Sequence, residues 1–271
     1  MLHVDQHREK CALPFIPNAC TCRPVSRKEI EENPKAKQAM QQEWDRLRSR
    51  KAWDETNPRE WSDVAREARQ SGIEVHVGMI FGFVVEKNND LPAGDARRKF
   101  KGRVVFQGNN VKNQNWENAM FADLGSTPSS MEAGRVVDAF GMRKGYTIQQ
   151  SDAVQAYLQA KIRGKPTWVI IPQDQRPEAW EGMKKPVCRL NVALYGHPDS
   201  GTDWEHHCKL SLNAAGFLGV GGECWPSCFY HKELDLLLSV YVDDFKLAGP
   251  KQPLKRGGSL FRSSLNVTHS P

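Results

Sequence analysis

LDLLLSVYVDDFKLAG, residues 234–249, is the stretch of sequence that decides the fold. Apolar, β-prone residues lie on both sides of two adjacent carboxylates, Asp243 and Asp244. The stretch therefore predicts a hairpin of two strands, with the carboxylates at or beside its tight turn. Charges in such an apolar setting need a compensating partner, and a divalent cation is the simplest one. The alternative is an ordinary solvated turn with polar tips, although no Gly or Asn supplies the usual two-residue turn.

The part of the chain before residue 131 predicts helices followed by a pair of strands. Residues 1–25 lack periodicity and are expected to form a poorly ordered leader, and residues 26–73 are expected to form an N-terminal helical segment. The predicted helices span about 35–52 and 58–71, and the predicted strands span 74–86 and 99–107. The second helix has its apolar residues on one face and ends at Gly72; these residues are Trp61, Val64, Ala65 and Ala68.

From residue 131 onward, predicted helices alternate with predicted strands. The helices span about 131–144, 153–159 and 200–216. The strands span 146–151, 167–171, 187–190 and 227–231, followed by the hairpin over 235–248. Asp152 comes directly after the first of these strands. Strands interspersed with helices and ending in a hairpin predict an α+β fold built in layers.

The charge of the chain is weakly positive overall but unevenly distributed. The 271 residues carry a formal charge of +6, with 39% hydrophobic and 26% charged residues, as in an ordinary globular protein. Two clusters hold many of the basic residues: Arg97, Arg98, Lys99, Lys101 and Arg103 form the first, and Lys246, Lys251, Lys255, Arg256 and Arg262 form the second. Basic clusters near a carboxylate pair suit a polyanion that approaches through metal ions.

The cysteines and the apolar runs of the sequence indicate the expected cellular location of the protein. Seven cysteines, an odd number, without a signal-peptide pattern favour reduced thiols in the cytoplasm or nucleus rather than secretion. The longest apolar run, LDLLLSVYV, is too short to span a bilayer, so no membrane partner is expected. Cys224, Cys228 and His231 do not have a usual zinc-finger spacing, and buried reduced cysteines are the favoured interpretation.

Four further strings accompany the hairpin in a definite order. They are KAKQAMQQEWDRLRSRKAW at 35–53, KFKGRVVFQGN at 99–109, SDAVQAYLQA at 151–160 and VCRLNVALYGHPDSGTDW at 187–204. With YVDD at 241–244, this series resembles the reverse transcriptase, the RNA-directed DNA polymerase, of copia-type retrotransposon Pol polyproteins. The resemblance covers roughly residues 26–250, and the order of the strings makes it far more specific than any one of them.

The resemblance implies the fold and its divisions. It implies the fingers and palm of a right-hand polymerase, with fingers over 74–130 and palm over 131–250. The palm of this family has a ferredoxin-like antiparallel sheet backed by helices. Residues 251–271 are expected to form a tail, because this Gly- and Ser-rich stretch does not resemble the family's thumb.

The resemblance also implies a metal site. Asp152, Asp243 and Asp244 match the family's catalytic carboxylates, which hold two Mg²⁺ or Mn²⁺ ions. Hard cations of this kind prefer carboxylate oxygens. From the residues alone, Asp152 could instead be the N-cap of the short helix that follows it.

Residues that bind substrates follow from the same resemblance. Tyr157 matches the aromatic residue that rejects a 2′-hydroxyl and so selects deoxynucleotides, although a core aromatic residue remains compatible with its position. Arg103 matches the triphosphate-binding arginine of the fingers, and Lys101 and Lys87 are its candidate partners. The alternative for these cations is a solvated strand face.

The loop after the strand at 187–190 both supports and weakens the resemblance. Tyr195 and Gly196 match the family's contact with the templating nucleotide. The family's usual ALYGLKQSPRAW is ALYGHPDSGTDW here, so that a basic residue has become Pro198 and an arginine has become Thr202 or Asp203. Fewer basic residues in this loop imply weaker template contacts.

Two functions therefore remain open. The first is addition of deoxynucleotides to a primer on an RNA or DNA template by two-metal catalysis. The expected partners are template-primer, deoxynucleoside triphosphates and the rest of a Pol polyprotein, in a cytoplasmic or nuclear retroelement particle. The second is a non-catalytic relic of such a polymerase with residual nucleic-acid binding. The retained aspartates favour the first, and the altered loop and unmatched thumb favour the second.

Overall fold

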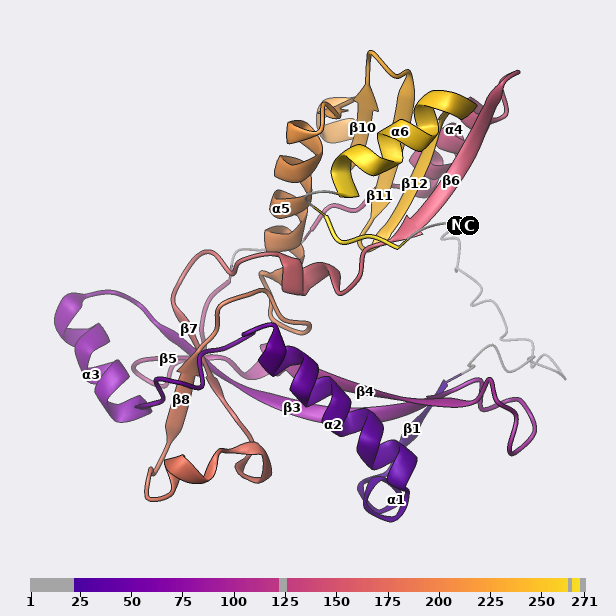
Figure 1. The fold of residues 1–271 in the computed structure, drawn as a ribbon. Helices are drawn as coiled ribbons and strands as arrows, with labels where there is room; N and C mark the ends of the chain where they lie inside the picture. Colours follow the sequence, from indigo (N-terminus) through magenta and orange to yellow (C-terminus); the bar gives the residue numbers. More distant parts are fainter. Residues whose placement is uncertain (1–21, 122–125, 263–264, 269–271) are drawn as a thin grey trace, which may run out of the picture. The chain divides into compact units, whose positions relative to one another are not determined.

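The computed structural model describes residues 22–121, 126–262 and 265–268 (Figure 1). The chain divides into two compact units. Unit 1 comprises Met1–Trp44 and Gly82–Arg103, and unit 2 comprises Asp45–Phe81 and Val104–Pro271. Helix α2 and strands β3 and β4 contribute residues to both units; their bounds are Pro34–Ser49, His76–Lys87 and Lys99–Phe106. Each unit has its own core, and the two are described separately.

Unit 1 begins with a strand where the sequence predicted the end of a leader. Residues 1–21 lie outside the described residues, but Cys22–Val25 form β1, so the leader prediction is wrong at its C-terminal end. Strand β1 pairs antiparallel with the end of β3, with Cys22 opposite Lys87. This pairing is long-range, which explains why local periodicity did not reveal it.

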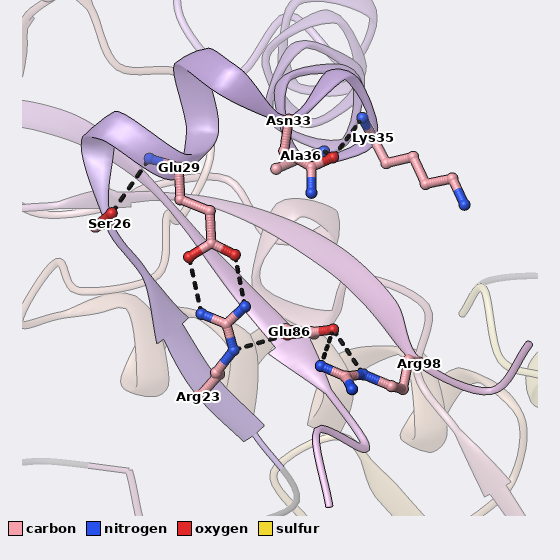
Figure 2. Close-up of polar contacts among 8 residues, drawn as sticks. All are labelled: Arg23, Ser26, Glu29, Asn33, Lys35, Ala36, Glu86 and Arg98. Atoms are coloured by element: carbon pink, nitrogen blue, oxygen red, sulfur yellow. Dashed lines mark hydrogen bonds and ion pairs between the residues drawn. The ribbon is translucent and has the colours of Figure 1, made fainter. Parts of the chain in front are cut away.

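Two helices follow β1, and both have capped N-termini (Figure 2). In α1 (Arg27–Glu32), the Ser26 hydroxyl accepts a hydrogen bond from the Glu29 N–H. In α2, the Asn33 side-chain oxygen accepts from the N–H groups of Lys35 and Ala36. Such caps satisfy N–H groups that have no partner inside the helix.

The core of unit 1 lies between its strands and its helices. It comprises Val25, Ala36 and Val84, with Ile30, Met40 and Phe100 packed against them. A Cβ atom on Gly102 would lie 2.4 Å from the carbonyl oxygen of Ala39, so only glycine allows β4 to approach α2 this closely. Side chains alternate along a strand, and Lys101 and Arg103 therefore point away from α2.

Unit 2 contains a first sheet built on the beginning of β3. Strands β5 (Lys112–Asn113), β7 (Thr167–Ile170), β8 (Pro186–Arg189) and β2 (Arg59–Glu60) complete it. Strand β7 runs parallel to β3 and antiparallel to β8, which pairs with β2. Helix α3 (Trp61–Ser71) covers this sheet with the apolar face predicted from the sequence: Trp61, Val64, Ala65 and Ala68.

The second sheet of unit 2 is antiparallel, with the strand order β6-β12-β11-β10-β9. Its strands are β6 (Tyr146–Asp152), β9 (Leu218–Gly219), β10 (Cys228–His231), β11 (Leu236–Tyr241) and β12 (Asp244–Pro250). Five short 3₁₀ turns lie between the longer elements of unit 2: Gly108–Asn110, Ala156–Gln159, Gln173–Gln175, Glu178–Trp180 and Gly222–Cys224.

Helices cover both faces of the second sheet (Figure 1). Helices α5 (Ser200–Ala214) and α6 (Lys251–Arg262) contribute Leu212 and Leu254 to the core on one face. Helix α4 (Met131–Gly141) packs on the other face, where Val137 contacts the cluster of Leu237 and Ala248. Within the described residues, two sheets and six α-helices confirm the α+β class.

Two segments differ from their predictions. The helix expected over 153–159 is only the 3₁₀ turn Ala156–Gln159, because Gln155 adopts a φ of 55°. The expected tail contains α6, in spite of its glycines. A Cβ atom on Gly257 would lie 2.0 Å from Leu236, so glycine is what allows α6 to lie against β11. None of the helices in the described part of the chain combines the length and apolar character needed to cross a bilayer.

Candidate active site

The predicted hairpin brings three aspartates to one end of the second sheet. Tyr241 pairs with Asp244 across β11 and β12, which leaves Val242 and Asp243 as a two-residue turn. Asp244 also lies directly opposite Asp152 on β6. The strand-end position of Asp152 and the hairpin position of the other two therefore converge, although their roles remain predictions.

Asp152 and Asp244 share one face of the sheet. Residues directly opposite each other in an antiparallel pair point to the same side, here the side covered by α4. Both side chains are exposed and line a pocket of about 690 Å³. Ser129, Ser239 and Lys246 also line this pocket.

The side chain of Asp243 does not line the pocket that Asp152 and Asp244 share. Its side chain is half-buried, and its charge, after burial, is a cause of the raised pKa of the Tyr157 hydroxyl. Asp243 lies in the two-residue turn rather than in β12, so it does not share the strand alternation that places Asp244 and Asp152 on one face. The three backbones meet, but the three carboxylates do not all face one pocket.

The donor set suits a divalent cation in type, although the ligands are not gathered. Across residues 22–121, 126–262 and 265–268, no group of three His, Cys, Asp or Glu side chains is placed to hold a metal ion. In the same ranges, no ion pair engages Asp243 or Asp244. The exposed carboxylate of Asp244 provides the hard oxygen ligands that Mg²⁺ prefers. These residues fit the group implied by the resemblance, with Asp152 and Asp244 opposite each other and Asp243 adjacent.

Main-chain hydrogen bonds hold this end of the sheet together. The Ala153 N–H donates to the Asp243 carbonyl at 2.7 Å. The Asp152 N–H donates to the Thr268 hydroxyl at 2.9 Å, and the Thr268 N–H donates to the Asp152 carbonyl at 2.8 Å. Sequence reasoning missed Thr268, because a Gly- and Ser-rich stretch gives no sign of strand pairing. The N-cap alternative for Asp152 is wrong, since Gln155 occupies the N-cap position of the following turn.

Tyr157 lies beside the aspartates and is half-buried. Its ring centroid is 4.5 Å from that of Tyr195, and it packs against the core formed with α5 and α6. The side chain thus has a packing role, while one part of it stays accessible. Both interpretations given by the sequence, a sugar gate and a core aromatic residue, agree with this placement.

Gly196 has a structural reason to be glycine. Its φ is 90°, and a Cβ atom would lie 2.2 Å from the Phe106 carbonyl oxygen. The Phe106 N–H donates to the Tyr195 carbonyl at 2.8 Å. The Tyr195–Gly196 turn is therefore fixed to the end of β4, and a larger residue there would separate the two segments.

The basic residues predicted to bind the triphosphate belong to unit 1, whereas the aspartates belong to unit 2. Lys87 ends β3 and is exposed, and Lys101 and Arg103 are partly exposed on one face of β4. Two other members of the first basic cluster are engaged internally. Arg97 pairs with Asp95 and Arg98 pairs with Glu86, so this cluster offers less positive charge than its sequence implies.

The altered loop before α5 is polar but not basic. Asp203 is 3% exposed and accepts hydrogen bonds from the N–H and Nε of Arg163, the latter at 2.8 Å. His197 is also buried, and burial lowers its pKa to about 4. At the positions where the family's usual motif has cations, this chain has Pro198 and either Thr202 or Asp203, and Asp203 is held in an internal ion pair.

Comparison with known proteins agrees with this architecture. The family model for "Reverse transcriptase (RNA-dependent DNA polymerase)" matches residues 78–255. The chain is also 25% identical over 173 residues to the Retrovirus-related Pol polyprotein from transposon TNT 1-94 of Nicotiana tabacum. The aligned region covers 61% of this chain but only 12% of that polyprotein. Because the family match extends over more than half of its residues, the chain belongs to the reverse transcriptase family, of the copia-type retrotransposon kind that its motifs predict.

Proposed function

We propose that this protein adds deoxynucleotides to a primer on an RNA or DNA template. The meeting of Asp152 and Asp244 across β6 and β12, with Asp243 in the adjoining turn, is the observation that carries this proposal. Cations bound at this end of the sheet would compensate the negative charge that the aspartates bring there.

Each candidate residue has a role in the proposed reaction. Asp152, Asp243 and Asp244 would hold two Mg²⁺ or Mn²⁺ ions. The charge of such ions, when bound, would lower the pKa of the primer hydroxyl and stabilise the departing pyrophosphate. The carboxylates orient the reacting groups, since small errors of placement cost much of the rate.

The substrate contacts come from the other candidates. Arg103, with Lys101 and Lys87, binds the triphosphate, and its planar guanidinium suits phosphate oxygens. Tyr157 lies beneath the sugar and rejects a 2′-hydroxyl. Tyr195 and Gly196 contact the templating nucleotide. In this proposal residues 74–130 are the fingers, and residues 131–250 are a ferredoxin-like palm.

The proposed setting is that of a retroelement. The partners are a template-primer, deoxynucleoside triphosphates and the rest of a Pol polyprotein, in a particle located in the cytoplasm or nucleus. Support for this setting comes from the family match and from the curated relative, whose name identifies it as a transposon polyprotein.

Primer extension tests the proposal. The chain is incubated with an oligo-dT primer on poly-rA, dTTP and Mn²⁺, beside Asp243→Asn and the matched control Asp174→Asn, whose carboxylate is exposed on a remote turn. We expect extension by the wild type and the control, and a loss of at least about 100-fold in Asp243→Asn. Extension that survives Asp243→Asn would remove the hairpin from the mechanism.

A non-catalytic relic that still binds nucleic acid is the second candidate. The pairing of Asp203 with Arg163, and the lack of Lys or Arg in the sequence of 197–203, favour it. The same experiment separates the two candidates. A relic would bind template-primer in a salt-dependent way, with no extension and with equal affinity in the wild type and Asp243→Asn.

A further inference from the structure

The turn of the hairpin has an unfavourable backbone conformation. Val242 has a φ of 55°, whereas Asp243, the other turn residue, has no positive φ. A positive φ at only the first central residue is the pattern of a type II′ turn, which favours glycine at this position. A β-branched residue in this region is a true outlier, so the surrounding structure must hold the turn in place.

One side chain contacts the turn directly. The indole N–H of Trp204 on α5 donates to the Val242 carbonyl at 2.6 Å, and Trp204 is 2% exposed. The next carbonyl, that of Asp243, accepts from the Ala153 N–H. The peptide units on either side of the Asp243 Cα atom are thus held from two different elements, α5 and the end of β6.

Packing alone does not hold the turn. A pocket of about 600 Å³ lies against Val242, Val240, Trp204 and Tyr157. Because this space borders Val242, side-chain contacts below the turn are incomplete, and the hydrogen bond is the directional restraint there. An indole N–H can only donate, and a buried hydrogen bond is stronger than an exposed one.

We propose that Trp204 is a positioning residue for the metal site. Its indole N–H holds Val242 in the left-handed region and thereby sets the direction of the Asp243 and Asp244 carboxylates. Without this bond, Val242 relaxes to a negative φ, and the peptide that leads to Asp243 rotates. This inference rests on the proposed function, because it assumes that the two aspartates bind a divalent ion.

Mn²⁺ affinity, measured by electron paramagnetic resonance, tests the proposal in four proteins: the wild type, Trp204→Phe, Val242→Gly and the double variant. Trp204→Phe keeps an aromatic ring but removes the donor, and we expect about tenfold weaker Mn²⁺ binding, as for the loss of one good hydrogen bond. In the Val242→Gly background we expect the same change to cost about twofold or less, because glycine adopts a positive φ unaided.

A control separates positioning from stability. Leu212→Val removes one methylene from the same helix and the same core without touching the turn. We expect it to lower the melting temperature and leave Mn²⁺ affinity unchanged. A loss of affinity in Leu212→Val equal to that in Trp204→Phe would reduce Trp204 to a packing residue.

The remaining outcomes distinguish this inference from the proposed function. If Asp243→Asn does not change wild-type Mn²⁺ binding, both are overturned. If Asp243 is needed but Trp204→Phe binds Mn²⁺ normally, or loses affinity equally in both backgrounds, only the role of Trp204 is overturned. Should Trp204→Phe not fold, the nitrogen-15 indole resonance of Trp204 in the wild type serves instead. It should shift with Mg²⁺, and an unchanged resonance at saturation contradicts the proposal.

Discussion

Two carboxylate sites in this molecule differ in how their negative charge is compensated. In unit 1, the Glu86 side chain is 6% exposed and lies between Arg23 at 2.7 Å and Arg98 at 2.8 Å (Figure 2). In unit 2, Asp152 and Asp244 lie exposed at the end of a sheet. A buried carboxylate needs protein cations, because it has lost its water. Carboxylates that stay exposed can take their compensation from outside the protein.

The comparison separates a structural site from a candidate functional one. Arg23 also donates to Glu29, and this bond lowers the pKa of Glu29. Every charge around Glu86 is thus used to join β1, β3 and the first helix. At the hairpin, by contrast, the protein supplies carboxylates that an added cation could bridge, which is the property that a metal-dependent enzyme needs.

The largest expected effect comes from breaking the Glu86 network. Glu86→Ala leaves Arg23 and Arg98 facing each other without their common anion, so we expect a loss of about 3 kcal/mol in the free energy of unfolding. Urea denaturation measures it, with the exposed pair of Lys28 and Glu32 as the reference. Glu32→Ala should cost well under about 1 kcal/mol, because exposed pairs contribute little. Equal losses in both variants would erase the distinction between buried and exposed carboxylates.

His197 offers a second test, since it is a buried titratable group. Burial lowers its folded-state pKa to about 4, below the ordinary unfolded value. The unfolded chain therefore binds the proton first, and stability is lost as pH falls from about 6.5 toward 4. We expect this residue to account for about 2 kcal/mol between pH 7 and 4.5.

The control for this prediction is His197→Leu. Urea unfolding at both pH values should show a smaller acid-induced loss in the variant than in the wild type. If the two proteins lose stability equally between pH 7 and 4.5, the acid sensitivity arises elsewhere.

Sequence patterns predicted the elements that create their own periodic signal. The predicted strand over 146–151 and the apolar flanks of 234–249 placed Asp152 and the hairpin close to their observed positions. The face of α3 was predicted for the same reason. These features depend on residues two to four positions apart, and the periodicity of the sequence predicts such features directly.

Features that depend on distant partners were not predictable. Strand β1 exists because it pairs with the end of β3, and Thr268 reaches Asp152 across more than a hundred residues. The basic cluster was interpreted as a polyanion surface, but Glu86, 12 residues from Arg98, neutralises part of it. The bond between Trp204 and the Val242 carbonyl is another example. No sequence pattern indicated which group the indole N–H of Trp204 contacts.

A smaller effect is expected from metal binding at the exposed carboxylates. Ligands that bind only the folded protein stabilise it, so 10 mM Mg²⁺ at a dissociation constant of about 1 mM should contribute about 1.4 kcal/mol. The melting temperature should rise accordingly, and Asp243→Asn should lose most of the rise. Asp174→Asn serves as the matched control. An equal rise in all three proteins would place the ions elsewhere.

The smallest expected effect comes from making the hairpin resemble the Glu86 site. Lys246 lies on the same face as Asp244 and donates to both carboxylate oxygens of Asp138 at 3.0 Å. In the Asp138→Asn variant, the ammonium group of Lys246 loses this carboxylate partner and can pair with the exposed aspartates instead. We expect Mg²⁺ affinity to fall about threefold, as a partly exposed ion pair contributes well under about 1 kcal/mol. Isothermal titration measures the affinity. Adding Lys246→Met should restore it, because the competing cation is gone, and a double variant as weak as Asp138→Asn would show that Asp138 acts on the metal site by another route.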